Sequence, residues 1–320
     1  MSLVVGSSLV CRSSAWLMFV VISSFAFAAA AEDASPVHPT KVADLVAFWD
    51  FQEPAGEVRT SKGPNGYSLQ ERQGPIARAD DGVFGPHSAQ VRERQWFELP
   101  RREIGALDIH GKSAQVTVVA WIKRSPKKGA WQAIAGVWDE SRGKRQYCLF
   151  LDAAAKTRST DLERDPCRGL VHGHVSSVGG PTPGRPVCVT YSSGATAVPL
   201  AEWHVIAMSY DGKFSRVYVD GKLDAAEPYN PFPYDEGLFD GGAEGSSFTV
   251  GSVSVREKPG NFFAGRIGGL AVYSRSHGRR TARTRAQSLN AQTLATAMMQ
   301  LSLLLLLASH RSVPAGVRAA

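Results

Sequence analysis

The chain has 320 residues, and its 36 Lys and Arg against 29 Asp and Glu give a formal net charge of +7. The whole excess falls in residues 275–320, which hold seven Arg and no acid, so the rest of the chain is neutral. Because a neutral body lacks the basic surface that binds phosphate backbones, the composition argues against a nucleic acid partner.

The N-terminus predicts a signal peptide over residues 1–31. Arg12 supplies positive charge, Ala15–Phe27 is an apolar run, and small alanines close the stretch. This order is typical of secretion signals, and the run is short for a bilayer-spanning helix, although a retained anchor is the alternative. We therefore expect a linker over residues 32–44 and a secreted, periplasmic or cell-surface protein whose mature domain has no membrane span.

From residue 45 onward, short apolar runs separated by turns predict strands. No stretch within 45–274 keeps a helical period over a useful length, and the chain is rich in turn residues, with 31 Gly and 18 Pro. The expected strands are 45–51, 95–100, 115–123, 131–138, 146–152, 170–178, 202–211, 214–219 with a return over 222–225, 248–255 and 262–274. About ten strands predict one all-β domain, a two-sheet antiparallel jelly-roll sandwich.

The clearest local motif is the hairpin RVYVDGKLDA, Arg216–Ala225. Alternate residues of a strand face opposite sides, so Val217 falls on one face and Tyr218 on the other. Asp220-Gly221 can adopt the positive φ angles of a type I′ turn. Together with the strand before it, this motif predicts three consecutive antiparallel strands over residues 203–225.

Three cysteines remain after the predicted cleavage, namely Cys148, Cys167 and Cys188. In an exported chain an odd number leaves one free thiol. Cys167 and Cys188 bracket a Gly- and Pro-rich stretch, and we predict a disulfide between them, worth about 3 kcal/mol in the chain-entropy model. Pairing of Cys148 with Cys188 is the alternative. Cys148 lies in an apolar strand, where a free thiol behaves as a small apolar residue.

Several segments show a pattern in a fixed order: AFWDFQEPAGE, AWIKR, EWHVIAMSYDGKFSRVYVDGKLD and NFFAGRIGGLAVYSR. In this order the chain resembles the laminin G-like jelly-roll domains of the concanavalin A-like lectin/glucanase superfamily. Their pattern of W, an apolar run, YDG, VYVDG and a final G-R-I strand is matched at Trp203, Tyr210–Gly212, Val217–Gly221 and Gly265–Arg275. The resemblance covers residues 45–275 and implies structural roles for the matched residues. It implies no single function, because this fold hosts binding modules, enzymes and structural domains.

Glucanases of this superfamily carry E-x-D-x-E or E-x-D-x-x-E on one strand, since hydrolysis by retention needs two carboxylates about 5.5 Å apart. The chain has no such motif, so we expect no catalytic residues and no glycosidase activity. Several laminin G-like domains bind calcium at a loop rim, and calcium is the one cofactor that we consider. Its candidate ligands are Asp235, Asp240 and Glu244, in a Gly-rich segment that is otherwise a solvated loop.

Two further features could contribute to a site. His172 and His174 share one face of an expected strand and could begin a metal site, but no third ligand is indicated, so we expect an ordinary surface pair. The loop Ser176–Pro186 could build a ligand surface or only cover the sheet. The aromatic residues that could stack on a ligand, although each is more typical of a core, are Trp96, Trp131, Trp138 and Tyr229.

The family-like pattern ends at Arg275. Residues 276–320 are basic and then leucine-rich, and they are a disordered tail, a weak anchor or the product of a shifted reading frame. The sequence as a whole predicts an exported, non-catalytic binding module for carbohydrate or an extracellular protein. The alternatives are a glycoside hydrolase or other hydrolase on the same scaffold, and a structural accessory domain of a larger exported protein.

Overall fold

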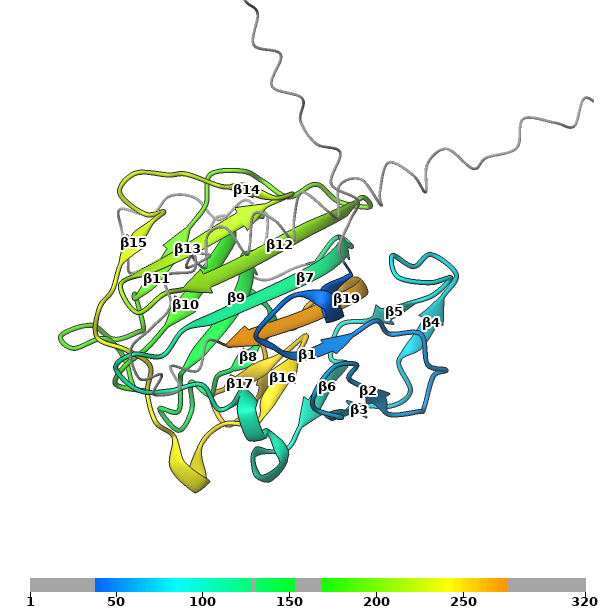
Figure 1. Ribbon diagram of the computed structural model, residues 1–320, viewed down its shortest axis with the longest axis horizontal. Helices are drawn as coiled ribbons and strands as arrows, with labels where there is room; N and C mark the ends of the chain where they lie inside the picture. Colours follow the sequence, from blue (N-terminus) through cyan, green and yellow to red (C-terminus); the bar gives the residue numbers. More distant parts are fainter. Residues whose placement is uncertain (1–37, 128–130, 153–168, 275–320) are drawn as a thin grey trace, which may run out of the picture. The chain divides into compact units, whose positions relative to one another are not determined.

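The computed structural model describes residues 38–127, 131–152 and 169–274, all of which lie in one compact unit (Figure 1). Two large antiparallel sheets form a sandwich, which confirms the predicted jelly-roll fold. Helical structure in the described ranges is confined to 3₁₀ turns at Pro39–Lys41, Arg101–Glu103, Gly105–Leu107 and Gly242–Glu244. No helix in these ranges is long and apolar enough to cross a membrane.

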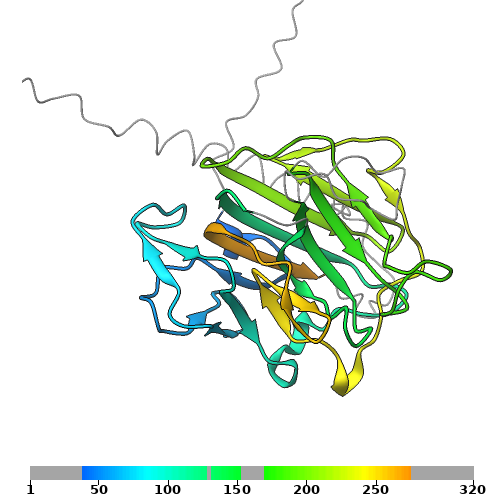
Figure 2. The same ribbon diagram turned by 180° about the vertical axis from the view of Figure 1, so that it is seen from behind.

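One sheet has nine strands in the order β14-β13-β12-β7-β19-β5-β4, with β1 paired to β19 and β15 to β13. The strands are β1 (Leu45–Trp49), β4 (Ala77–Ala79), β5 (Ser88–Val91), β7 (Val116–Arg124), β12 (Trp203–Tyr210), β13 (Phe214–Val219), β14 (Lys222–Leu223), β15 (Phe232–Pro233) and β19 (Gly265–Ser274). The pairing of β1 with β19 brings the first and last described strands side by side (Figures 1 and 2).

The other sheet has eight strands in the order β11-β10-β9-β8-β16-β6-β3-β2. They are β2 (Arg59–Thr60), β3 (Ser68–Arg72), β6 (Trp96–Leu99), β8 (Trp131–Val137), β9 (Tyr147–Asp152), β10 (Val171–Val175), β11 (Tyr191–Ser193) and β16 (Phe248–Val250). β17 (Val253–Val255) and β18 (Lys258–Gly260) form a separate two-stranded ribbon.

The eight-stranded sheet is apolar on both faces. Along β9, Leu149 and Leu151 belong to the main core between the sheets, while Cys148 and Phe150 belong to a second apolar cluster. Because successive side chains of a strand point to opposite faces, this second cluster lies on the outer face of the sheet. The sheet therefore differs from an antiparallel sheet that has one face on the core and the other in water.

The predicted hairpin is confirmed. β12, β13 and β14 are consecutive neighbours, and Asp220 and Gly221 have φ angles of 45° and 85°. Val217 packs in the main core and Tyr218 in a cluster on the opposite face. Asp224, just after β14, is buried and accepts hydrogen bonds from the Ala195 and Thr196 amides.

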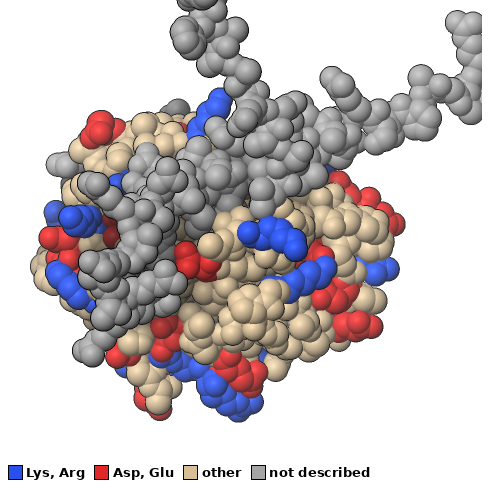
Figure 3. All heavy atoms as spheres, in the orientation of Figure 1, with Lys and Arg blue, Asp and Glu red and all other residues tan. Residues whose placement is uncertain are grey.

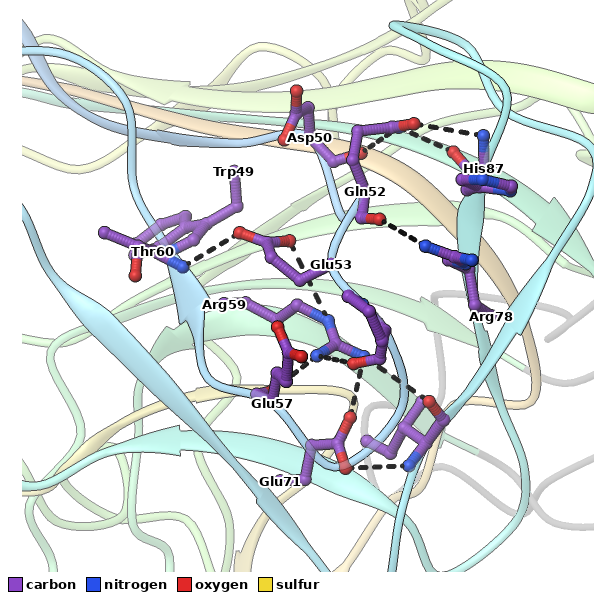
Figure 4. Close-up of polar contacts among 12 residues, drawn as sticks. Trp49, Asp50, Gln52, Glu53, Glu57, Arg59, Thr60, Glu71, Arg78 and His87 are labelled. Carbon is purple, nitrogen blue, oxygen red and sulfur yellow. Dashed lines mark hydrogen bonds and ion pairs between the residues drawn. The ribbon is translucent and has the colours of Figure 1, made fainter.

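A buried arginine holds the loop between β1 and β2. Arg59 donates to the carbonyl oxygens of Pro54, Glu57 and Ile76 and pairs with Glu71, with Nη2 and Oε1 2.7 Å apart (Figure 4). Its guanidinium also lies over the Phe97 ring. Several short strands of this region, β2–β5, were not expected from the sequence, and this network is part of what orders them.

Residues 1–37 and 275–320, with the predicted signal peptide and tail, lie outside the described residues. Within the predicted linker, Pro39 is buried and its carbonyl accepts a hydrogen bond from the Tyr273 hydroxyl. On the face drawn in Figure 3, acidic and basic side chains are interspersed, as expected for a neutral body.

Candidate functional site

A hollow of about 320 Å³ opens on the outer face of the eight-stranded sheet and is lined by aromatic side chains. β8, β9, β10 and β11 contribute Trp131, Phe150, His174 and Tyr191, and Trp138 follows directly after β8. These residues point outward because their neighbours along the strands point into the core. The volume lies at the lower end of the range for ligand pockets, roughly 300–1,000 Å³.

The aromatic rings of the hollow pack tightly around His174. Its ring stacks on Tyr191 at a centroid distance of 4.3 Å and meets Phe150 at 4.6 Å. Trp131 and Trp138 each approach it edge-on at 5.4 Å. Trp138 and Phe150 are almost fully buried, whereas Trp131 is partly exposed. The hollow therefore has a rigid aromatic floor, with Trp131 as its most accessible ring.

Polar groups form one wall of the hollow. Glu140 Oε1 accepts hydrogen bonds from Trp138 Nε1 and Asn261 Nδ2, both at 3.4 Å. Burial raises the pKa of Glu140, and the nearby Arg145 and the Trp138 hydrogen bond offset only part of this effect. The Arg145 guanidinium lies over the Trp138 ring, 5.9 Å from its centroid.

The segment after β10 forms the opposite wall through Val187, Cys188 and Val189. None of the residues of the loop Ser176–Pro186 lines the hollow; the lining residues follow directly after it. Cys188 is half-buried, and its Sγ lies 3.2 Å from Thr190 Oγ1.

Cys148 is a buried free thiol, as predicted, and burial raises its pKa well above the ordinary value. Cys167 lies outside the described residues. The disulfide between Cys167 and Cys188 therefore stays a prediction.

A second, more polar hollow of about 200 Å³ shares Trp138 with the first. Two of its carboxylates are already engaged by arginines: Glu98 accepts from Arg72 Nε at 2.8 Å, and Asp139 from Arg142 Nε at 2.7 Å. Asp139 also accepts from the Ser141 amide and so closes the turn after Trp138. These carboxylates hold the structure together and are not free to react.

The expectation of a surface histidine pair is wrong, because His172 and His174 are both buried. β10 lies between β9 and β11, and the aromatic rings of those neighbours and of β8 cover its outer face. His172 Nε2 lies 3.1 Å from Asp152 Oδ2. The Asp152 carboxylate also accepts from the Gly169 and Leu170 amides. The pair is thus part of the packed floor.

The proposed calcium ligands lie apart from the aromatic hollow's lining. Asp235 and Glu244 are exposed. Within the described ranges, the one group of three possible metal ligands joins Asp240 to Asp108 and His110. Arg101 binds both oxygens of Asp108, at 2.8 and 2.6 Å, so this carboxylate is already neutralised. The group is a poor fit for a hard cation, which needs free oxygen ligands.

Of the candidate aromatic residues, Trp131 and Trp138 line the first hollow and Trp96 the second, whereas Tyr229 lines neither. Sequence reasoning missed Glu140, Arg145 and Asn261. Glu140 lies within the turn 139–144 (DESRGK) and Arg145 directly follows it. The composition of this segment indicates a turn and gives no sign that it lines a hollow.

The family model described as "Concanavalin A-like lectin/glucanases superfamily" (Laminin_G_3) matches residues 97–279. No curated protein matches the sequence. Solved structures with a similar fold include domain 4 of AbnA, a GH43 extracellular arabinanase from Geobacillus stearothermophilus, in complex with arabinotriose. It is 16% identical, with a TM-score of 0.48, and the match covers 80% of this chain and 98% of that one.

Two further matches are more distant. The Ruminococcus gnavus IT-sialidase CBM40 bound to alpha2,3 sialyllactose is 17% identical, with a TM-score of 0.40 and coverage of 60% of this chain and 92% of that one. Trypanosoma rangeli sialidase with 2,3-difluorosialic acid is 14% identical, with a TM-score of 0.45 and coverage of 81% and 33%. At these identities the likeness concerns the fold alone.

Proposed function

The chain belongs to the concanavalin A-like lectin/glucanases superfamily, and from that premise we propose that it is a carbohydrate-binding protein whose site is the aromatic hollow of the eight-stranded sheet. The observation that carries the proposal is the composition of that hollow. A partly exposed Trp131 stands over a rigid aromatic floor, beside a wall of polar groups.

This combination suits a sugar. A pyranose ring has an apolar face of C–H groups and an edge of hydroxyls. An aromatic ring can pack against the face, while a few fixed polar groups orient the edge. Trp131 and Trp138 offer the first kind of contact, and Glu140, Arg145 and Asn261 offer the second.

We propose that the protein binds a carbohydrate without hydrolysing it. Glycoside hydrolysis needs two carboxylates at a fixed separation, and Glu140 is the single carboxylate among the described residues that line the aromatic hollow. In the neighbouring hollow Glu98 and Asp139 are paired with arginines, and Glu257 is exposed on a turn.

A glycoside hydrolase is the second candidate function, and one observation favours it. Burial raises the pKa of Glu140, which is the property that a general acid requires. Release of reducing ends from polysaccharides by the purified protein, lost in Glu140→Gln, would move the protein into the enzyme class.

The proposal includes export, which is supported by Arg12, the apolar run Ala15–Phe27 and the small residues that follow. An extracellular protein is the other ligand class that an exported module could bind. The proposed export is tested by sequencing the N-terminus of protein recovered from the culture medium. The expected result is a start near residue 32. Recovery only from the cell interior would contradict it.

Binding is tested with the full chain on a glycan array, followed by calorimetric titration of the best oligosaccharide. Trp131→Ala should weaken binding at least about tenfold, or about 1.4 kcal/mol. The matched control is Phe214→Ala, an exposed aromatic on β13 in the other sheet, which should leave affinity unchanged. No binding to any glycan, or equal losses in both variants, would contradict the proposed site.

A further inference from the structure

Arg145 is a buried cation that contacts no carboxylate among the residues that the structure describes. Its side chain lines the aromatic hollow although the residue is only 6% exposed. A guanidinium has five N–H donors. Within the described ranges it donates one side-chain hydrogen bond, from Nη1 to the Gly179 carbonyl at 3.3 Å, and its Nε has no partner. No ion pair joins it to a described carboxylate, so most of its donors remain unused.

Arg59 shows how this protein satisfies a buried arginine that serves the fold alone. It is 1% exposed, pairs with Glu71 and Glu53, and donates to three backbone carbonyls (Figure 4). A buried charge is costly unless it is paired and hydrogen-bonded. Arg145 has no such anionic partner among the described residues. The equally buried Arg124 has none either, but of the two only Arg145 lines the aromatic hollow.

The position of Arg145 indicates where that partner comes from. Its guanidinium lies over Trp138 and beside the ring floor of the hollow, so a sugar that packs on the aromatic rings would reach the cation. We propose, on the basis of the proposed function, that the hollow recognises a sugar carrying an anionic group, a carboxylate or a sulfate, which pairs with Arg145. A planar guanidinium binds both groups through two parallel hydrogen bonds.

The neighbouring acids do not replace this partner. Glu140 is the carboxylate whose pKa responds to the Arg145 charge. It makes no ion pair with Arg145 and accepts hydrogen bonds from Trp138 and Asn261 instead. Burial raises the pKa of Glu140, and the Arg145 charge offsets only part of that shift. Asp139 is engaged by Arg142 on the side of the second hollow.

The test compares four probes on the full chain by calorimetry: an oligogalacturonate, its methyl ester, a sulfated galacto-oligosaccharide and the neutral galacto-oligosaccharide. One or both acidic probes should bind at least about tenfold more tightly than their neutral counterparts. The methyl ester arm needs no variant, so it remains decisive even if a substitution perturbs folding. Preference between the two acidic probes identifies the anion as carboxylate or sulfate.

Arg145→Gln should weaken binding of the acidic probe much more than binding of the neutral probe and so remove the preference, and Arg145→Lys should retain part of it. The matched control is Arg142→Gln, a half-exposed arginine in the second hollow, which should have little effect. Equal losses in Arg142→Gln and Arg145→Gln would mean general surface electrostatics and overturn the inference.

The failure of this inference is distinguishable from the failure of the proposed function. Trp131-dependent binding of neutral and acidic sugars with equal affinity, unaffected by Arg145→Gln, would overturn the inference and keep the function. Absence of all sugar binding would overturn both.

Discussion

Glu140 is the residue through which pH should act on the site. Burial raises its pKa above the ordinary value of 4.5, so the carboxyl ionises only at a higher pH than in water. The ionised form would repel an anion held by Arg145. Affinity for an acidic sugar is therefore expected to fall as pH rises through the raised pKa. Calorimetric titration with the acidic probe from about pH 5 to about pH 8, where the sugar itself stays ionised, measures this change in affinity.

Glu140→Gln is the control, since the amide stays neutral and should give a flatter profile. The other titratable or charged groups that act on Glu140 or line the hollow with it are Arg145, Asp139, Cys148, Cys188 and His174. The thiol of Cys148 stays protonated in this range because burial raises its pKa well above the ordinary value. An unchanged decline in Glu140→Gln would assign the effect to another group and contradict the prediction.

Asp224 is a buried carboxylate that ties the end of the β13–β14 hairpin to a neighbouring loop. Its carboxylate accepts from the amides of Ala195 and Thr196 and from the Thr196 hydroxyl. Asp224→Ala would leave these donors without their acceptor, at a cost of about 1–3 kcal/mol in the free energy of unfolding. The exposed Asp235→Ala is the matched control and should cost almost nothing. Urea denaturation measures both, and equal midpoints would show that Asp224 is dispensable.

At the scale of elements, β8 positions both tryptophans of the hollow, and Gly136 fixes how closely β8 approaches β9. A Cβ at Gly136 would lie 2.3 Å from the Tyr147 carbonyl oxygen and 2.6 Å from the Cys148 Cα. Both are backbone atoms that cannot turn aside. Gly136→Ala should therefore lower the free energy of unfolding by about 3 kcal/mol, the upper end of the usual range for overpacking. It should also weaken sugar binding.

The matched control is Gly66→Ala, where a Cβ would meet nothing within 4 Å. Thermal unfolding followed by circular dichroism compares the two variants. A Gly136→Ala protein as stable as Gly66→Ala would contradict the tight packing of β8 on β9.

The elements also differ in how far the sequence predicted them. β7 and β12, with nine and eight residues, carry enough apolar periodicity to be recognised, and the β13–β14 hairpin adds a turn signal. β2 and β15 have only two residues each and no such turn signal, so neither shows a period. β2 is held by Arg59, one of its own residues, through bonds to Ile76 and Glu71, which lie outside the local sequence.

At the scale of the whole molecule, the sequence predicted the sandwich but only part of the site. Trp131 and Trp138 were candidates by residue type. Arg145 and Glu140 line the same hollow because the turn segment 139–145 places them beside the two tryptophans. His172 and His174 were placed at the surface because alternation predicts which face a residue occupies, not what covers that face. The family pattern likewise fixes the scaffold and leaves the ligand open.

Diffraction from crystals of the protein soaked with its best-binding oligosaccharide tests the central claim most directly. The account predicts a sugar ring in the aromatic hollow, packed against Trp131 beside Trp138, with its polar edge toward Glu140, Arg145 and Asn261. A sugar bound only elsewhere, such as beside Asp108, His110 and Asp240, with the hollow empty at saturating ligand, would contradict it.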